Sequence, residues 1–177
     1  MGLIGEWRAA RERRRRADGY LRGLLSPPAA AEVDWLAGIV GDRSLAEREL
    51  IFARRALGLI VAERDALDDR TAADVAHALA DVVENEARRS SVVAAAWIAR
   101  RRAYSDAMSV RGQAEAPTTR FARVLLAGGG VTTPSEEALG RAAHFMQSTR
   151  TQANEALRAA YGMASLPDDV RPSAIRT

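Results

Sequence analysis

The stretch that decides the fold is residues 8–28, which read RAARERRRRADGYLRGLLSPP. Its apolar side chains recur at spacings of three and four residues, which is the period of one face of an α-helix. Extended back toward the first residue, this seam consists of Leu3, Trp7, Ala10, Arg14, Ala17, Leu21 and Leu24. Ser26 and Pro27 are expected to end this helix and to open the next, as its cap and first residue. The sequence therefore predicts an amphipathic N-terminal helix over residues 3–25, whose apolar face must pack on another surface.

Four consecutive arginines, residues 13–16, lie in the middle of this helix. Arg14 interrupts the seam, whereas the other three fall off it, so we interpret the run mainly as the solvated face of the helix. The basic patch consists of Arg11, Arg13, Arg15 and Arg16. The candidate interface consists of Leu3, Trp7, Arg14, Leu21 and Leu24.

Helix signals continue along the rest of the chain, and strand signals are nearly absent. Ser44 and Glu47 form a capping box, and Thr133 and Pro134 supply a cap followed by a first-turn proline. The three glycines at 128–130 are interpreted as a tight helix connection, and residues 111–119 as a linker. Further helices are expected at about residues 27–40, 44–67, 71–108, 120–127 and 134–161.

These elements predict an all-α bundle of about six helices. Its two long central helices are residues 44–67 and 71–108. The chain divides into the basic N-terminal helix (1–26), which docks on its own bundle or on a neighbour, the bundle (27–162) and an irregular tail (163–177).

The composition excludes several kinds of chemistry. The 177 residues are 47% hydrophobic and 28% charged, which is typical of a globular protein. There is no cysteine, and all 26 basic residues are arginine, so thiol chemistry and lysine Schiff bases are absent. The arginine bias indicates a GC-rich genome, bacterial or from a phage. No apolar stretch is long enough to span a membrane and no signal peptide is recognisable, so we expect a cytoplasmic protein.

Charge is distributed unevenly along the chain. Residues 1–26 carry seven arginines and three acids, a net charge of +4, whereas residues 27–70 carry six arginines and nine acids, a net charge of −3. The surplus positive charge therefore sits in the first helix. We expect this helix to pair with the acidic segment that follows it, either within one chain or between subunits.

Glu86 is the most unusual polar residue, because it lies within an apolar stripe of the expected helix 71–108. A carboxylate in such a place must be paired, hydrogen-bonded or protonated, and we predict a buried ion pair with an arginine of a facing helix. Glu49 and Glu63 also fall near the apolar arc of their helix. A di-iron site would need Glu-x-x-His pairs, which His77 and His144 do not form. We therefore expect no metal, no cofactor and no catalytic residue.

Three functions remain open. The first is a non-enzymatic protein that binds another protein or copies of itself through the first helix, as a structural subunit, adaptor or assembly factor. The second is an electrostatic binder of nucleic acid or of an anionic membrane surface through the same helix. The third is an enzyme or small-ligand binder centred on Glu86. No recognisable sequence motif supports the second function or the third.

Overall fold

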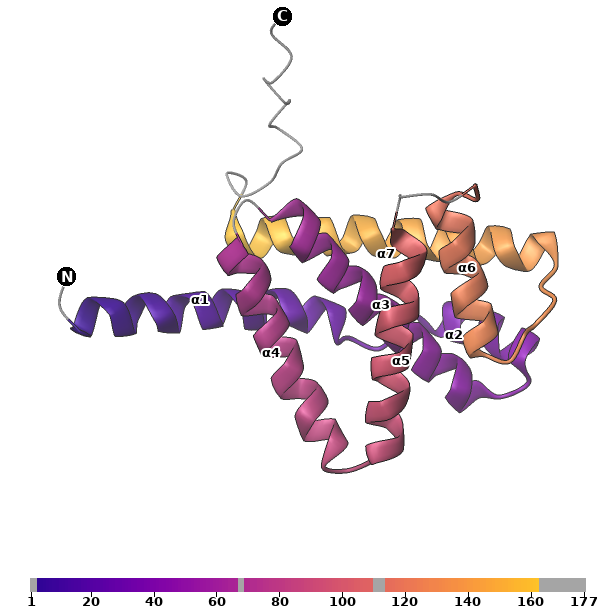
Figure 1. Cartoon of the computed structure of the whole chain (residues 1–177), viewed down its shortest axis with the longest axis horizontal. Helices are drawn as coiled ribbons and strands as arrows, with labels where there is room; N and C mark the ends of the chain where they lie inside the picture. The colour runs from indigo at the N-terminus through magenta and orange to yellow at the C-terminus, as the bar shows by residue number, and fades with distance from the viewer. Residues whose placement is uncertain (1–2, 67–68, 110–113, 163–177) are drawn as a thin grey trace, which may run out of the picture.

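The computed structural model describes residues 3–66, 69–109 and 114–162, and these form seven α-helices with no strand among them (Figure 1). The prediction of an all-α bundle is confirmed. The helices are α1 (Leu3–Leu24), α2 (Ala30–Val40), α3 (Arg43–Asp65), α4 (Asp69–Ala87), α5 (Ser91–Met108), α6 (Pro117–Gly128) and α7 (Glu136–Tyr161). The predicted irregular tail, residues 163–177, lies outside the described residues.

Helix α3 is the centre of the bundle. It contacts each of the other six helices, and most of its length is buried. Helix α7 packs along α1, α3 and α6, while α4 and α5 form a hairpin whose turn points away from α7 (Figure 1). The largest fully buried apolar side chains are Tyr20, Leu36, Leu50, Phe52, Leu57, Tyr104, Phe121, Leu125, Leu126 and Leu157. One hydrophobic core therefore joins all seven helices.

The single long helix expected over residues 71–108 is wrong, because the chain breaks it into α4 and α5 at residues 88–90. Ser90 adopts an extended conformation, and its hydroxyl accepts a hydrogen bond from the amide of Val93 at 3.4 Å, which caps α5. The break spans nearly one helical turn, so the apolar spacing continues across it without interruption. The periodicity alone could not reveal two helices.

Three predicted caps are also wrong. The N-cap of α7 is Ser135 and not Thr133, since the Ser135 hydroxyl accepts from the amide of Ala138 at 3.2 Å and Pro134 precedes the helix. The N-cap of α3 is Asp42 and not Ser44, since the Asp42 carboxylate accepts from the amide of Leu45 at 3.0 Å. The Ser26 hydroxyl donates to the carbonyl of Gly23 at 2.7 Å and so serves the end of α1, while α2 begins three residues later than predicted. The last helix ends at Tyr161 as predicted, and α6 begins at Pro117, inside the expected linker.

Candidate functional site

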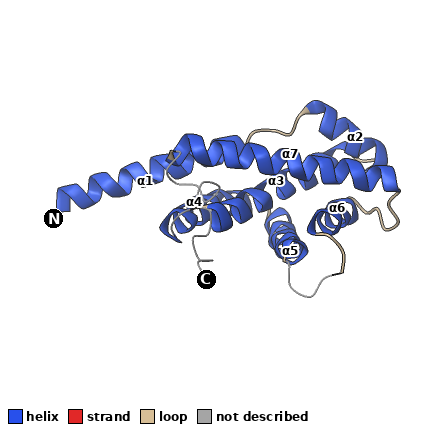
Figure 2. Ribbon diagram, turned by 90° about the horizontal axis from the view of Figure 1, so that it is seen from above, coloured by secondary structure: helices blue, strands red, loops and turns tan. Residues whose placement is uncertain are grey.

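The two halves of α1 lie in different surroundings. In residues 17–24, which we call the stem, Ala17, Tyr20, Leu21 and Leu24 are buried. Every residue from 5 to 12, which we call the tip, is exposed, and the tip extends beyond the bundle in both views (Figures 1 and 2). The chain therefore continues one helix for more than two turns past the surface that supports it.

The stem is fixed by buried polar contacts to α3. The Tyr20 hydroxyl donates to the carbonyl of Gly58 at 2.7 Å, and burial raises the pKa of this phenol, so that it remains a donor. Only glycine fits at position 58, because a Cβ there would lie 2.1 Å from Leu24 Cδ1. The Leu24 side chain of α1 can therefore pack directly against the backbone of α3 at Gly58.

Arg54 holds the end of the stem. Its guanidinium donates to the carbonyls of Gly23, Ser26 and Pro27 at 3.1–3.2 Å and to the Ser26 hydroxyl at 3.1 Å. Burial lowers the pKa of Arg54, and nearby Glu32 raises it in part. A buried arginine thus satisfies carbonyls that the end of α1 and the following turn leave without helical partners. The sequence signal was a charged pair, Arg54 and Arg55, within an otherwise apolar stretch of α3.

The four arginines of residues 13–16 divide between α4 and solvent. Arg13 Nε lies 3.4 Å from Asp74 Oδ2, and an Arg14 amino group lies 3.2 Å from Asp81 Oδ2. Arg16 pairs within α1, with Glu12 at 3.2 Å. Among the described residues, the ion pairs that join α1 to another helix therefore go to α4 and not to residues 27–66, within the segment where they were expected.

The residues of the candidate interface divide between the core and the surface. Leu21 and Leu24 are buried as the seam requires, but Arg14 is largely exposed and the Trp7 residue is 62% exposed. The buried face instead includes Tyr20 and the half-buried Arg13, which the seam left out. The side chain of Leu3 lies outside the described part of the structure.

Trp7 belongs to a basic strip on the side of α1 that faces away from the bundle, which we call the outer face. The Arg11 guanidinium lies 5.5 Å from the centre of the Trp7 ring, within range of a cation–π contact. The outer face consists of Trp7, Arg8, Arg11, Glu12, Arg14, Arg15, Asp18 and Arg22. Among the described residues, Arg8, Arg11, Arg15 and Arg22 form no ion pair. This surface combines an aromatic ring with unpaired positive charge.

Glu86 pairs with an arginine of a facing helix, as predicted. Its two carboxylate oxygens accept from Arg55 at 2.6 and 2.7 Å. Its side chain is nevertheless 34% exposed, because α4 ends at Ala87 and leaves one side of Glu86 open. The expectation that Glu86 is buried is therefore wrong. With both oxygens engaged, this carboxylate acts as the partner that a buried arginine requires.

Among the described residues, the fully buried carboxylate is that of Glu49, which accepts from Arg100 Nε at 2.7 Å. The same arginine donates to the carbonyl of Gly128 at 3.1 Å, and its hydrogen bond to Glu49 raises its pKa. A Cβ at Gly128 would lie 2.2 Å from Glu49 Oε2, so the first of the three glycines makes room for the ion pair. Glu63, by contrast, is exposed and 4.0 Å from Arg101. The three carboxylates therefore serve separate arginines.

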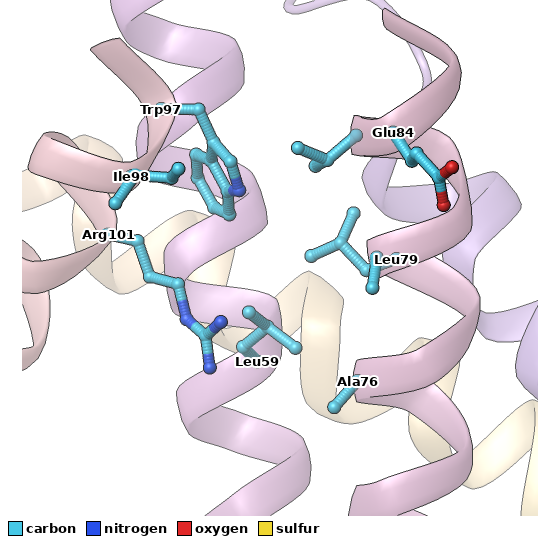
Figure 3. Close-up of a pocket in the computed structure, with 9 residues that line it drawn as sticks. Leu59, Ala76, Leu79, Glu84, Trp97, Ile98 and Arg101 are labelled. Atoms are coloured by element: carbon cyan, nitrogen blue, oxygen red, sulfur yellow. The ribbon is translucent and has the colours of Figure 1, made fainter. Parts of the chain in front are cut away.

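Two of the cavities that lie away from α1 are lined by an exposed isoleucine. The α4–α5 cavity, of about 370 Å³, opens between the two arms of that hairpin (Figure 3). Leu79 approaches it from α4, Trp97 and the exposed Ile98 from α5, and Leu59 forms its floor (Figure 3). A second cavity, of about 270 Å³, lies where α2 meets the start of α7, and we call it the distal pocket. Its lining is mixed, with apolar Trp35, Ile39, Val131, Pro134 and Ala138 beside polar Thr133, Ser135 and Glu137.

Other classes of site find little support among the residues that the structure describes. His77 and His144 are both exposed, and no group of three potential metal ligands occurs in the described part of the chain. None of the described helices is long and apolar enough to cross a membrane. Comparisons of the chain with protein-family models, with curated proteins and with solved structures found no match.

Proposed function

We propose that this protein acts by binding another protein through the outer face of α1, as a structural subunit, adaptor or assembly factor. The observation that carries the proposal is the exposed tip of α1, with Trp7 and its neighbouring arginines. A helical segment of this length is marginal in water by itself. A tip that continues so far beyond its own bundle gains most from a surface on which to pack. The cytoplasmic location remains a prediction from the sequence.

The chemistry of the outer face favours a protein partner. Tryptophan and arginine are the residues that most often dominate the energy of protein–protein interfaces. Glu12 and Asp18 lie within the same strip, where they would oppose a uniform surface of phosphates but would suit a partner of mixed charge. The stem supports this role, because Arg54 and Tyr20 hold α1 rigidly to α3.

Photo-cross-linking tests the proposal on the full chain. A benzophenone side chain placed at Arg8 suits this protein, because it has no lysine for amine-reactive reagents. We expect illumination to produce a covalent adduct with one defined protein. That partner protein is then purified, and its affinity for the wild type is compared with its affinity for Trp7→Ala. Trp7→Ala should weaken this binding at least tenfold, because truncating a residue that dominates an interface costs at least that much affinity. Equal binding of both proteins would contradict the proposal.

The unpaired arginines support one competing function, the binding of phosphates on nucleic acid or on anionic lipid. Replacing Arg8, Arg11 and Arg15 together by Gln distinguishes the two. If duplex DNA is the ligand, the wild type binds it and the slope of log affinity against log salt falls by about 3 in the variant. We expect instead that, at physiological salt, the wild type binds duplex DNA and phosphatidylserine vesicles no more tightly than the variant does.

A further inference from the structure

The protein carries its own candidate for the partner of the outer face, at the end of the molecule that lies farthest from the tip. Figure 1 shows the tip of α1 at one end of the longest axis, and α2 with the start of α7 at the other. The two regions therefore cannot meet within one chain. Any contact between them must join two copies.

The far end is acidic. Defined as residues 30–47 and 131–141, it carries Glu32, Asp34, Asp42, Glu47, Glu136 and Glu137 against Arg43 and Arg141, a net charge of −4. Apart from Glu32, which is partly buried, all of these carboxylates are on exposed residues. Both arginines are already engaged, Arg43 with Asp34 and Arg141 over the ring of Trp35. The outer face of α1 carries five arginines and two acids, a net charge of +3. The two ends are thus complementary in charge.

The far end also offers a place for an aromatic ring. The distal pocket opens among the acidic residues, with Glu137 in its own lining and an Ile39 residue that is 37% exposed. The α4–α5 cavity is larger but lacks this charge, since its lining holds one acid, Glu84, and one arginine, Arg101. Of these two cavities, only the distal pocket combines apolar side chains, set among polar ones, with surplus negative charge around it.

We propose that the protein assembles head to tail, with Trp7 of one copy seated in the distal pocket of the next and its arginines facing the carboxylates around it. This proposal rests on the proposed function and names its partner as a second copy of the chain. The contact joins two different surfaces, so each copy keeps one tip and one pocket unused. Such an interface builds rings or open filaments rather than a dimer that closes on itself.

The test uses a matched pair of substitutions in the two cavities and one in the tip. Ile39→Arg places a positive charge in the distal pocket, and Ile98→Arg makes the same change in the α4–α5 cavity, where the residue is 66% exposed. Trp7→Ala removes the ring but leaves the distal pocket intact. All are made in the full chain, with circular dichroism to verify folding and sedimentation velocity at low salt over about 1 µM to 1 mM.

We expect the wild type and Ile98→Arg to form species larger than dimers, and Trp7→Ala and Ile39→Arg each to remain monomeric. The decisive sample is a mixture of the two monomeric variants. One has a pocket and no tip, the other a tip and no pocket, so together they should form a 1:1 dimer and nothing larger.

Several outcomes would overturn the proposal. A wild type that stops at a dimer indicates a symmetric interface, and assembly lost in Ile98→Arg but kept in Ile39→Arg places the contact in the α4–α5 cavity. A mixture that stays monomeric excludes the tip-to-pocket contact. A monomeric wild type that still binds a different protein through Trp7 would overturn self-assembly and leave the proposed function standing, whereas the loss of all Trp7-dependent binding would overturn both.

Discussion

The stem and the tip of α1 belong to one continuous helix, yet they are built for different purposes. The stem contributes Tyr20, Leu21 and Leu24 to the core and is tied to α3 by hydrogen bonds from Tyr20 and Arg54. The tip has the same helical geometry but exposes every residue from 5 to 12. The comparison teaches that an amphipathic pattern predicts a helix with a face to bury, while the partner that buries it can change along the helix.

The strongest way to break the comparison is to place a charge in the stem. Leu21 is almost fully buried, so Leu21→Asp puts a carboxylate in the core with no cation provided for it. We expect a loss of stability of about 4 kcal/mol or more, which would unfold many domains of this size. Urea denaturation followed by circular dichroism measures it. A small loss would mean that the stem is not part of the core.

The Arg54 clamp should come next in size. Arg54→Ala leaves the carbonyls of Ser26 and Pro27 without their donor, and Gly23 keeps only the Ser26 hydroxyl, so we expect a loss of about 3 kcal/mol. Arg54→Lys is the matched control, because it keeps one charged donor and should lose about half as much. Equal losses in both variants would show that the fork of the guanidinium is not what holds the end of the stem.

The close approach at Gly58 sharpens the comparison further. In Gly58→Ala the new methyl group would meet Leu24, so we expect overpacking to cost about 1–3 kcal/mol even though alanine favours helices. Gly5→Ala in the tip is the matched control, since nothing lies near that position, and it should be neutral or slightly stabilising. A stabilised Gly58→Ala protein would show that α1 and α3 are not closely packed there.

Much of the fold could be predicted from the sequence because local signals set it. Helix spacing located α1, α3 and α7 well, although the caps shifted by two residues, with Asp42 capping α3 and Ser135 capping α7. The break between α4 and α5 was missed for the opposite reason. A gap of nearly one turn preserves the apolar spacing, so only the capping hydroxyl of Ser90 marks it.

The candidate site was harder to predict, because it depends on partners that are remote in sequence. The seam included Leu21 and Leu24, which are buried, but it also included Arg14, which is exposed, and left out Arg13, which is half-buried. In the structure both arginines reach acids of α4, because long side chains extend from either edge of the buried face. The pattern could show that Glu86 needs an arginine, but it could not choose Arg55 among 26 arginines.

The most direct measurement is a comparison of wild type and Trp7→Ala in two experiments, thermal unfolding and sedimentation velocity. Because Trp7 is exposed and outside the core, the change should alter the unfolding free energy of the monomer, measured at low concentration, by at most about 0.5 kcal/mol. At high concentration and low salt it should convert the assembled wild type to monomers. A destabilised Trp7→Ala monomer whose assembly matches that of the wild type would contradict the account, since it would make the tip part of the fold rather than a surface for binding.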